Sequence, residues 1–311
     1  MPISKLCPAA LLILFSLLQT ACAAESYPVT QITDGVFYHQ GVHEDPSEQN
    51  IGAIANVGFI VGDKCVAVID SGGSFEEGLL LKHAIQNHTD KPVCYVINTH
   101  VHPDHILGNA VFKDSKPIYI GHEKLPAALE SRKDFFERVF SESLGDAYTG
   151  AEFIAPGLTV SIDKPLKLDL GNRELVLTAY TTAHTDHDLT VFDKTSQTLW
   201  TGDLLFIERT PALDGSINGW IDAIEQLQQQ AVRFVVPGHG PAGEKQWQAG
   251  LTEQLNYFLT MRQQIRDIIN DFGTIEEATT TVAIEEKDKW LLFDEYHRRN
   301  VTAAFVELEW E

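Results

Sequence analysis

The stretch that decides the fold of this 311-residue chain is VINTHVHPDHILGNAVF, residues 96–112. It begins in a nearly continuous apolar run, VCYVIN, which is typical of a central strand covered on both faces. Directly afterwards come His100, His102, Asp104 and His105. In an extended or turning loop, residues two apart point the same way, so His100 and His102 can converge on one metal ion. Asp104 and His105 then face a neighbouring ion.

Two metal ions need more ligands than this loop supplies, and three later stretches offer them. His184 lies in TTAHTDHD, Asp203 in LWTGDLLF and His239 in VVPGHGP. Each follows a predicted strand and sits in a polar or glycine-containing loop, where a ligand can be aimed at a shared sheet edge. The hypothesis is therefore two metal sites that share a bridging carboxylate. One site has His100, His102 and His184, the other has Asp104, His105 and His239, and Asp203 bridges them.

The chain around these ligands alternates strands and helices in both halves, which favours an α/β architecture of packed layers. Predicted strands lie at 36–41, 56–63, 65–74, 93–98, 158–163, 166–170, 174–182, 189–193, 198–206 and 233–241. A helix is predicted over 76–87, with Leu79, Leu80, His83, Ala84 and Ile85 facing the sheet. Residues 123–150 predict an amphipathic helix, either a lid or a cover for the sheet edge.

From Glu244 onward the pattern becomes helical. An apolar stripe runs from Trp247 to Ile268 and Gly273 ends it, Thr274 and Glu277 offer a capping box, and a last helix follows. We predict a helical extension over 244–311 that packs on a main domain at 25–243.

The first residues, MPISKLCPAALLILFSLLQTACAAES, have the layout of a secretory signal over 1–24. Cleavage near Ala23 or Ala24 is favoured over lipidation at Cys22, and the mature protein is expected in the periplasm or secreted. A formal charge of −21 argues against nucleic acid and anionic lipid as partners. No later segment predicts a membrane span.

Cys65 and Cys94 remain after the predicted cleavage, both in apparently buried strands. An oxidising compartment permits a disulfide. Two packed thiols are preferred here, because adjacent parallel strands rarely offer the geometry that a disulfide requires.

The ordered motifs VIDSG, THVHPDH, AHT, GD and PGHG resemble those of the metallo-β-lactamase superfamily of metallohydrolases, over roughly 50–243. The resemblance implies a four-layer αββα sandwich with two mixed sheets and metals in a cleft at one edge. It further implies a binuclear zinc hydrolase in which a hydroxide held by Asp104 attacks an ester, thioester, lactone or amide carbonyl.

With Asp203 in its GD motif, the chain resembles the glyoxalase II and lactonase branches of the superfamily. The β-lactamase subclasses lack a bridging aspartate, so β-lactamase activity is doubtful. The signal segment, THVHPDHILGNAVF, PALDGSINGW and YHRRNVTAAFVELE also resemble exported metallohydrolases associated with quinoprotein and sulfur-oxidation systems. A periplasmic quinoprotein system is therefore an expected partner.

Further site residues are expected around the ligands. Asp70 either orients the ligand loop by hydrogen bonding or caps a turn. Substrate contacts are expected from loops around the cleft, with ordinary loop structure as the alternative for each residue. The candidates are His122, His187, Arg209, Asn218 and Trp220.

Two other functions use the same residues. One iron at the three-histidine or two-histidine-carboxylate positions would support thiol or persulfide dioxygenation. A metal-carrying accessory protein without turnover would handle a quinone cofactor or its dehydrogenase. Retention of both ligand sets favours two metals and catalysis.

Overall fold

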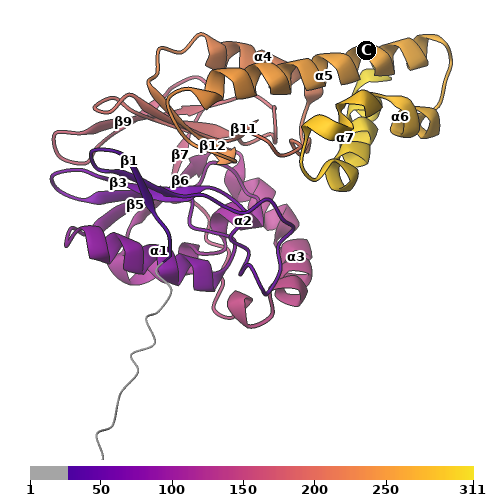
Figure 1. The fold of residues 1–311 in the computed structure, drawn as a ribbon. Coiled ribbons are helices and arrows are strands. Elements are labelled where there is room, and N and C mark those ends of the chain that lie inside the picture. The colour runs from indigo at the N-terminus through magenta and orange to yellow at the C-terminus, as the bar shows by residue number, and fades with distance from the viewer. Residues whose placement is uncertain (1–26) are drawn as a thin grey trace, which may run out of the picture.

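A computed structural model describes residues 27–311, so the predicted signal segment lies outside the described residues. Two mixed β-sheets stack face to face, and helices cover both outer faces (Figure 1). This is the expected four-layer αββα sandwich. Among residues 27–311, no helix is both long enough and apolar enough to cross a bilayer.

The first sheet has seven strands in sequence order. Its early strands pair antiparallel, and the pairs from β4 onward are parallel. The strands are β1 (Thr30–Thr33), β2 (Val36–His39), β3 (Val57–Val61), β4 (Val66–Ile69), β5 (Val93–Ile97), β6 (Ile118–His122) and β7 (Leu158–Val160). The parallel pairs need crossovers, which run through α1 (Phe75–His88), α2 (Pro103–Ile106) with η1 (Asn109–Ser115), and α3 (Leu125–Leu144) with η2 (Gly145–Tyr148).

The second sheet has the order β12-β11-β10-β9-β8. Its strands are β8 (Leu166–Asp169), β9 (Glu174–Ala179), β10 (Leu189–Asp193), β11 (Thr198–Phe206) and β12 (Phe234–His239). Only β11 and β12 pair parallel, and α4 (Ile217–Gln228) makes the crossover between them.

Strand alternation explains the layers. In β4, Ala67 and Ile69 pack between the sheets, whereas Val66 and Val68 pack on the opposite face, with residues of α1. On the second sheet, Trp200 of β11 faces the inter-sheet core. The sheets are therefore buried on both faces, which is why the central strands read as continuous apolar runs.

Helix α1 has nearly the predicted bounds, but its predicted buried face is partly wrong. Leu79 and His83 are exposed. The buried residues are Glu77, Gly78, Leu81, Ala84 and Ile85. Close approach sets this rotation, because a Cβ on Gly78 would lie 2.7 Å from the Cα of Gly108.

The preference for two free thiols is also wrong, because Cys65 and Cys94 form a disulfide. The pairing of β4 with β5 moves from Val66 opposite Val93 to Ala67 opposite Tyr95, which leaves Cys94 as an extra residue. This irregularity frees Cys94 from the regular parallel register that the prediction assumed. The Cα atoms lie 5.8 Å apart, within the usual range for a disulfide.

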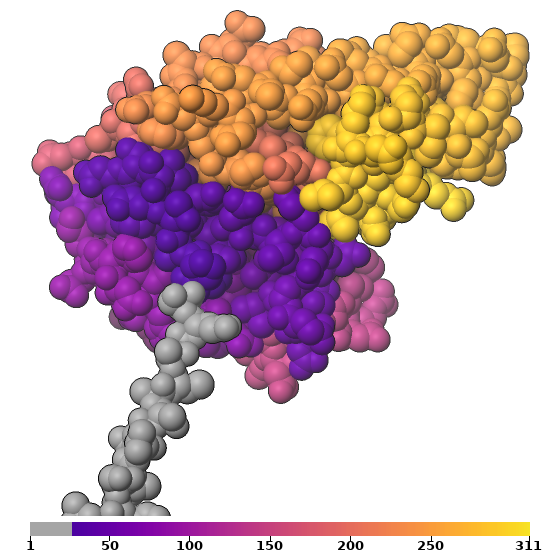
Figure 2. All heavy atoms as spheres, viewed as in Figure 1, coloured from indigo at the N-terminus to yellow at the C-terminus, as the bar shows by residue number. Residues whose placement is uncertain are grey.

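The chain ends in α5 (Gln246–Asn270), α6 (Ile275–Thr281), η3 (Ile284–Lys289) and α7 (Phe293–Leu308). The Thr274 hydroxyl accepts from the backbone N–H of Glu277, so half of the predicted capping box is formed. Residues of α5 and α7 share one apolar cluster with β11 and α4. The last helices lie beside the sandwich at the end that also carries α3 (Figures 1 and 2).

Candidate metal centre

The His-rich loop begins directly after β5 and runs into α2, which starts with Pro103 at its first position. His100 and His102 therefore lie in the loop, and Asp104 and His105 lie in the first helical turn. Proline suits this position because a first-turn N–H has no helical partner. Of the other predicted ligands, His184 follows β9 and His239 ends β12, whereas Asp203 lies within β11 and not in a loop after it. All three side chains meet the His-rich loop.

The predicted ligands form two groups, within each of which one ligand atom per residue lies within 4.8 Å of the others. The first group is His100, His102, His184 and Asp203, and the second is Asp104, His105 and His239. This division matches the predicted one.

Asp203 lies between the two groups. Its Oδ2 is 3.6 Å from His100 Nε2 and 3.4 Å from His184 Nε2. Its Oδ1 is 3.1 Å from His105 Nε2, and Oδ2 is 3.4 Å from His239 Nε2. One carboxylate thus reaches both groups, as a bridging ligand must.

Two glycines allow this close approach. Gly202 has φ +50°, and a Cβ there would lie 2.6 Å from the Thr99 side chain. A Cβ on Gly238 would lie 2.0 Å from Asp203 Oδ1. Gly238 of the PGHG motif therefore makes room for the Asp203 carboxylate, and Gly202 of the GD motif lets β11 approach Thr99.

Each of the five histidines has its outer ring nitrogen beside an oxygen. His184 Nδ1 lies 2.6 Å from Ala212 O, and His239 Nδ1 lies 2.8 Å from Ile54 O. A carbonyl can only accept, so His184 Nδ1 carries the proton. His239 Nδ1 carries it in the tautomer that donates to Ile54 O, the shorter of its two contacts, the other being Arg209 Nη1 at 3.2 Å. This leaves the Nε2 lone pair of both rings facing the cluster, as a metal ligand requires.

The remaining three histidines are oriented in the same way by side chains. His105 Nδ1 lies 2.8 Å from Asp70 Oδ2, and His100 Nδ1 lies 3.0 Å from Thr99 Oγ1. His102 is turned over: its Nε2 lies 3.1 Å from Asp214 Oδ2 and its Nδ1 faces His184. His100 therefore turns its Nε2 toward the cluster, whereas His102 turns its Nδ1. The spacing of the histidines in the sequence does not predict this difference.

Asp70 takes the orienting position predicted for it. Its carboxylate accepts from the Thr99 N–H and hydroxyl, each at 2.8 Å, as well as from His105. The residue adopts φ 53°, an uncommon conformation for a non-glycine residue. Such outliers persist where the surroundings hold them, often at functional sites.

Asp214 is an orienting residue that the sequence reading missed. It lies 112 positions from His102, accepts from His102 Nε2, and also pairs with Arg132 of α3. These partners lower the pKa of its carboxyl and outweigh partial desolvation, so Asp214 remains charged. The loop FIERTPALDGSINGW contains it, but only as one polar residue among several.

Burial lowers the pKa of His184 to about 4 and holds that of His100 well below its ordinary value. Burial also lowers the pKa of His105, but Asp203, Asp104 and Asp70 outweigh it and raise that pKa well above normal. For Asp203, burial raises the pKa, and the neighbouring histidines outweigh it and lower it. Neutral imidazoles and an ionised carboxylate are the metal-binding forms, so binding would release a proton from His105.

These residues fit a metal. His100 Nε2, His105 Nε2 and Asp203 Oδ1 are buried and have no hydrogen-bond partner among the described residues. Unpartnered buried polar atoms are costly, and their convergence is explained if cations bind them. Mixed imidazole and carboxylate donors suit zinc, and also iron.

A cleft of about 400 Å³ opens over this cluster. The exposed side of the ligands forms its floor through His102, Asp104, Asp203 and His239. One wall comes from α3 and another from α7. The predicted helix over 123–150 therefore borders the site, whether or not it moves.

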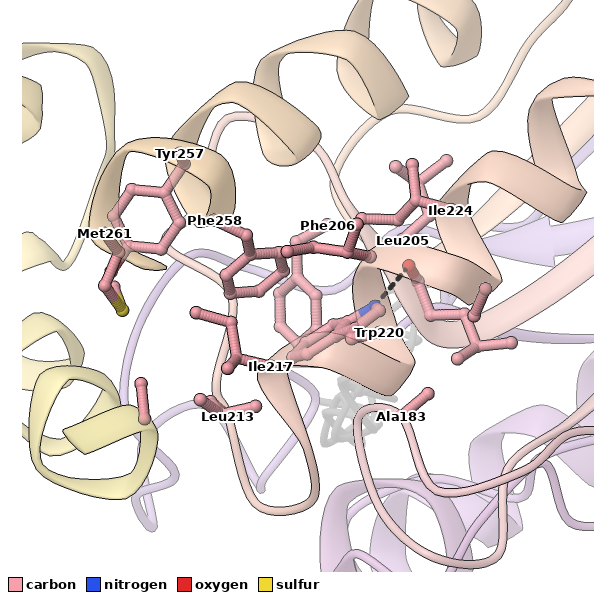
Figure 3. Close-up of a cluster of buried hydrophobic side chains, with 14 of the residues drawn as sticks. Ala183, Leu205, Phe206, Leu213, Ile217, Trp220, Ile224, Tyr257, Phe258 and Met261 are labelled. Carbon is pink, nitrogen blue, oxygen red and sulfur yellow. Dashed lines mark hydrogen bonds between the residues drawn. The ribbon is translucent and has the colours of Figure 1, made fainter. Parts of the chain in front are cut away.

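The five expected substrate contacts fare differently. Arg209 lines the cleft. Trp220 does not fit that role, because its ring is fully buried and its indole N–H donates to Leu204 O within the core drawn in Figure 3. Asn218 donates instead to Glu307 and Glu311. The loop folds back on the helical extension, which removes both residues from the cleft.

Two histidines expected at the cleft are buried beside it. His122 Nε2 lies 3.2 Å from Tyr180 O, and its Nδ1 accepts from the Lys124 N–H. His187 Nδ1 lies 2.5 Å from the Thr185 hydroxyl. Among residues 27–311, neither belongs to the cleft lining. Both side chains are fully buried, so neither is open to the cleft in this structure.

The comparisons with known proteins agree on one fold. A family model described as the metallo-beta-lactamase superfamily matches residues 51–239. A metallo-beta-lactamase from Pontibacter korlensis superposes with a TM-score of 0.59 at 20% identity, covering 75% of this chain and 98% of that one. The DIM-1 metallo-beta-lactamase gives 0.58 at 16% identity, with 75% and 96% covered. No curated protein matches significantly.

A larger structure covers more of the chain. The stereoselective inverting sec-alkylsulfatase Pisa1 from Pseudomonas sp. superposes with a TM-score of 0.68 at 18% identity. The match covers 90% of this chain but only 50% of the alkylsulfatase. Coverage of 90% cannot be reached without residues after 243, so the likeness includes part of the helical extension.

The family match spans more than half of the chain and contains every residue of the two-group cluster. The stacked mixed sheets and the cluster at their edge are the features that this match predicts. The chain therefore belongs to the metallo-beta-lactamase superfamily of metal-dependent hydrolases.

Proposed function

We propose that the protein is a binuclear zinc hydrolase that cleaves an ester, thioester, lactone or amide. The observation that supports this most directly is the orientation of five imidazoles. Each has its outer nitrogen fixed by an oxygen, so each can present a lone pair to the cluster that contains Asp203. These ligands suffice for two cations, which is more than a protein that binds a single metal ion would need.

When bound, two divalent cations supply a water of lowered pKa and polarise the scissile carbonyl. The protein's own part is positioning. Asp104 is the ligand-group carboxylate most open to the cleft, 14% exposed against 4% for Asp203. We assign Asp104 the role of holding the attacking water and accepting its proton. Asp203 reaches both ligand groups and fixes their separation.

The presence of Asp203 also bears on which kind of bond the enzyme cleaves. The β-lactamase subclasses of the family resemblance lack a bridging aspartate, whereas glyoxalase II-like and lactonase-like members carry one. Asp203 therefore favours these branches over β-lactam hydrolysis. At 20% and 18% sequence identity, the β-lactamase and alkylsulfatase structures show a shared fold and do not indicate the substrate.

Export and a role beside a periplasmic quinoprotein or sulfur-oxidation system are part of this proposal. They rest on the first 24 residues and on the resemblance of the loop at 211–220 and of the last helix. The disulfide between Cys65 and Cys94 is compatible with an oxidising compartment.

Elemental analysis of the mature protein, purified without added metal or chelator, tests the proposal. We expect about two zinc per chain and hydrolysis of at least one member of an ester, thioester and lactone panel. Removal of metal should abolish turnover, and zinc should restore it.

Other results would replace the proposal. One iron per chain, with oxygen consumption on thiols or persulfides, would make the protein a dioxygenase. Two bound metals without turnover of any panel member would favour a metal-binding accessory protein.

A further inference from the structure

The walls of the cleft contain a positive charge beside the metal cluster. Arg209 is 3% exposed and lines the cleft. Its Nη2 donates to the Tyr296 hydroxyl at 2.7 Å, and its guanidinium lies over the Tyr296 ring. Its Nη1 lies 3.2 Å from Nδ1 of His239. Among residues 27–311 it forms no ion pair with a carboxylate, and its Nε has no hydrogen-bond partner.

An unpaired buried guanidinium is costly, so its retention needs a reason. The chain carries 44 acidic side chains against 23 Lys and Arg, so carboxylates are abundant. Arg132 of the same cleft is in fact paired, with Asp214. Arg209 instead meets the neutral Tyr296 hydroxyl, which donates to Asp45 Oδ1 at 2.9 Å, so a carboxylate lies one hydrogen bond beyond the guanidinium and does not pair with it directly.

A second arginine stands at the mouth of the same wall. Arg299 follows Tyr296 by three residues on α7, so the two side chains lie on the same helix face. It lines the cleft, is exposed, and forms no ion pair with any described residue. Arg298, its neighbour, is also exposed but lies outside the cleft lining.

The wall that α3 contributes is largely apolar, apart from Arg132. Phe135, Phe136, Val139 and Phe140 of α3 line it. Phe135 is 55% exposed, an unusual state for a large aromatic side chain. The cleft thus sets an apolar surface on α3 across from cations that come from the loop after β11 and from α7.

We infer that this hydrolase acts on an amphiphilic anion, a substrate whose apolar chain lies on α3 and whose anionic group binds Arg209 and Arg299. The inference rests on the proposed hydrolase function and adds the class of substrate. Guanidinium groups bind carboxylate, sulfonate or phosphate groups through charge-assisted hydrogen bonds, which explains two arginines without carboxylates.

Chain-matched esters test this. The p-nitrophenyl monoester of suberic acid carries a terminal carboxylate, and p-nitrophenyl octanoate is its neutral counterpart. We expect a lower KM for the anionic ester. Arg299→Gln should raise that KM about fivefold with little change in kcat and leave the neutral ester unaffected. Arg298→Gln should change neither constant. Phe135→Ala should raise KM for the octanoate ester but not for p-nitrophenyl acetate.

Calorimetric binding gives a readout without turnover. The metal-replete protein should bind 1-octanesulfonate more tightly than 1-octanol, and Arg299→Gln should weaken only the sulfonate by about fivefold. Because Arg209 is buried, Arg209→Lys is tested beside it, with circular dichroism as the check on folding.

Failure of the proposed substrate class can be distinguished from failure of the proposed hydrolase function. Hydrolysis of both octanoyl-length esters with equal KM, unchanged in Arg299→Gln, would overturn the substrate class and leave the hydrolase standing. If no ester is turned over, sulfonate binding that depends on Arg299 still supports the anionic site. Sulfonate binding that is equal in wild type and Arg299→Gln would overturn it.

Discussion

The floor and the walls of the cleft are built differently. Floor residues such as His105 and Asp203 are buried, and their polar atoms face the other ligands of the cluster. Wall residues such as Phe135 and Arg299 stand exposed on helices. The difference separates two tasks, because the rigid floor fixes the kind of reaction and the walls decide which substrate reaches it.

Deleting the residues after Gly243 tests whether the walls can be separated from the floor. The deletion removes α7 from the cleft and strips the partners of Trp220 and Phe206 from one apolar cluster. Each large apolar side chain that becomes exposed costs about 1.5–3 kcal/mol. The summed cost of several such side chains reaches the usual free energy of unfolding of a domain, about 5–15 kcal/mol. We expect an insoluble or unfolded product, measured by solubility and circular dichroism. A folded, active product would show that the floor is independent.

Asp203→Asn tests the centre of the floor. The amide keeps the shape of the side chain but removes the charge that neighbours both ligand groups. We expect activity to fall by more than about 100-fold and metal content to drop, a greater loss than is typical for an outer partner. Activity and elemental analysis measure this. Full activity with unchanged metal content would remove the bridging role.

Asp214→Asn tests the connection between floor and wall, because Asp214 contacts both His102 and Arg132. The neutral amide holds the His102 ring less firmly, so metal affinity should fall about 10- to 100-fold. Competition with a chelator measures it. Arg132→Gln removes only the wall partner and should have a smaller effect. Equal metal affinity in wild type and Asp214→Asn would contradict the orienting role.

The smallest effect concerns a carboxyl beneath the floor. Burial raises the pKa of Glu77 to about 7, while its oxygens accept from the Tyr27 hydroxyl and the Gly73 N–H. Between pH 4.5 and 7 the folded state therefore holds a proton that the unfolded state has released, so this group makes stability fall as pH rises. Urea unfolding of Glu77→Gln should show a shallower decline over this range than wild type. Parallel curves for the two proteins would refute the assignment.

Much of the fold was predictable because its signals are local. Apolar runs of strand length, punctuated by glycine, predicted the central strands, and period-3.6 patterns predicted α1, α3 and α5. The rotation of α1 was not predictable, because contact between Gly78 and Gly108 sets it. The disulfide escaped prediction for a similar reason, since it depends on an irregularity in strand pairing at Cys94.

For the site, sequence alone determined which seven residues were candidate metal ligands, because imidazole and carboxylate chemistry and strand-end positions can be read from the chain. Only the tertiary structure decided which ring nitrogen of each histidine faces the cluster, that Asp214 orients His102, and that Trp220 and Asn218 leave the cleft. It also brought α3 and α7 together across one opening. Several of these contacts join residues far apart in the sequence, 112 positions for His102 with Asp214 and 89 for Asn218 with Glu307, and their geometry depends on packing that no local pattern records.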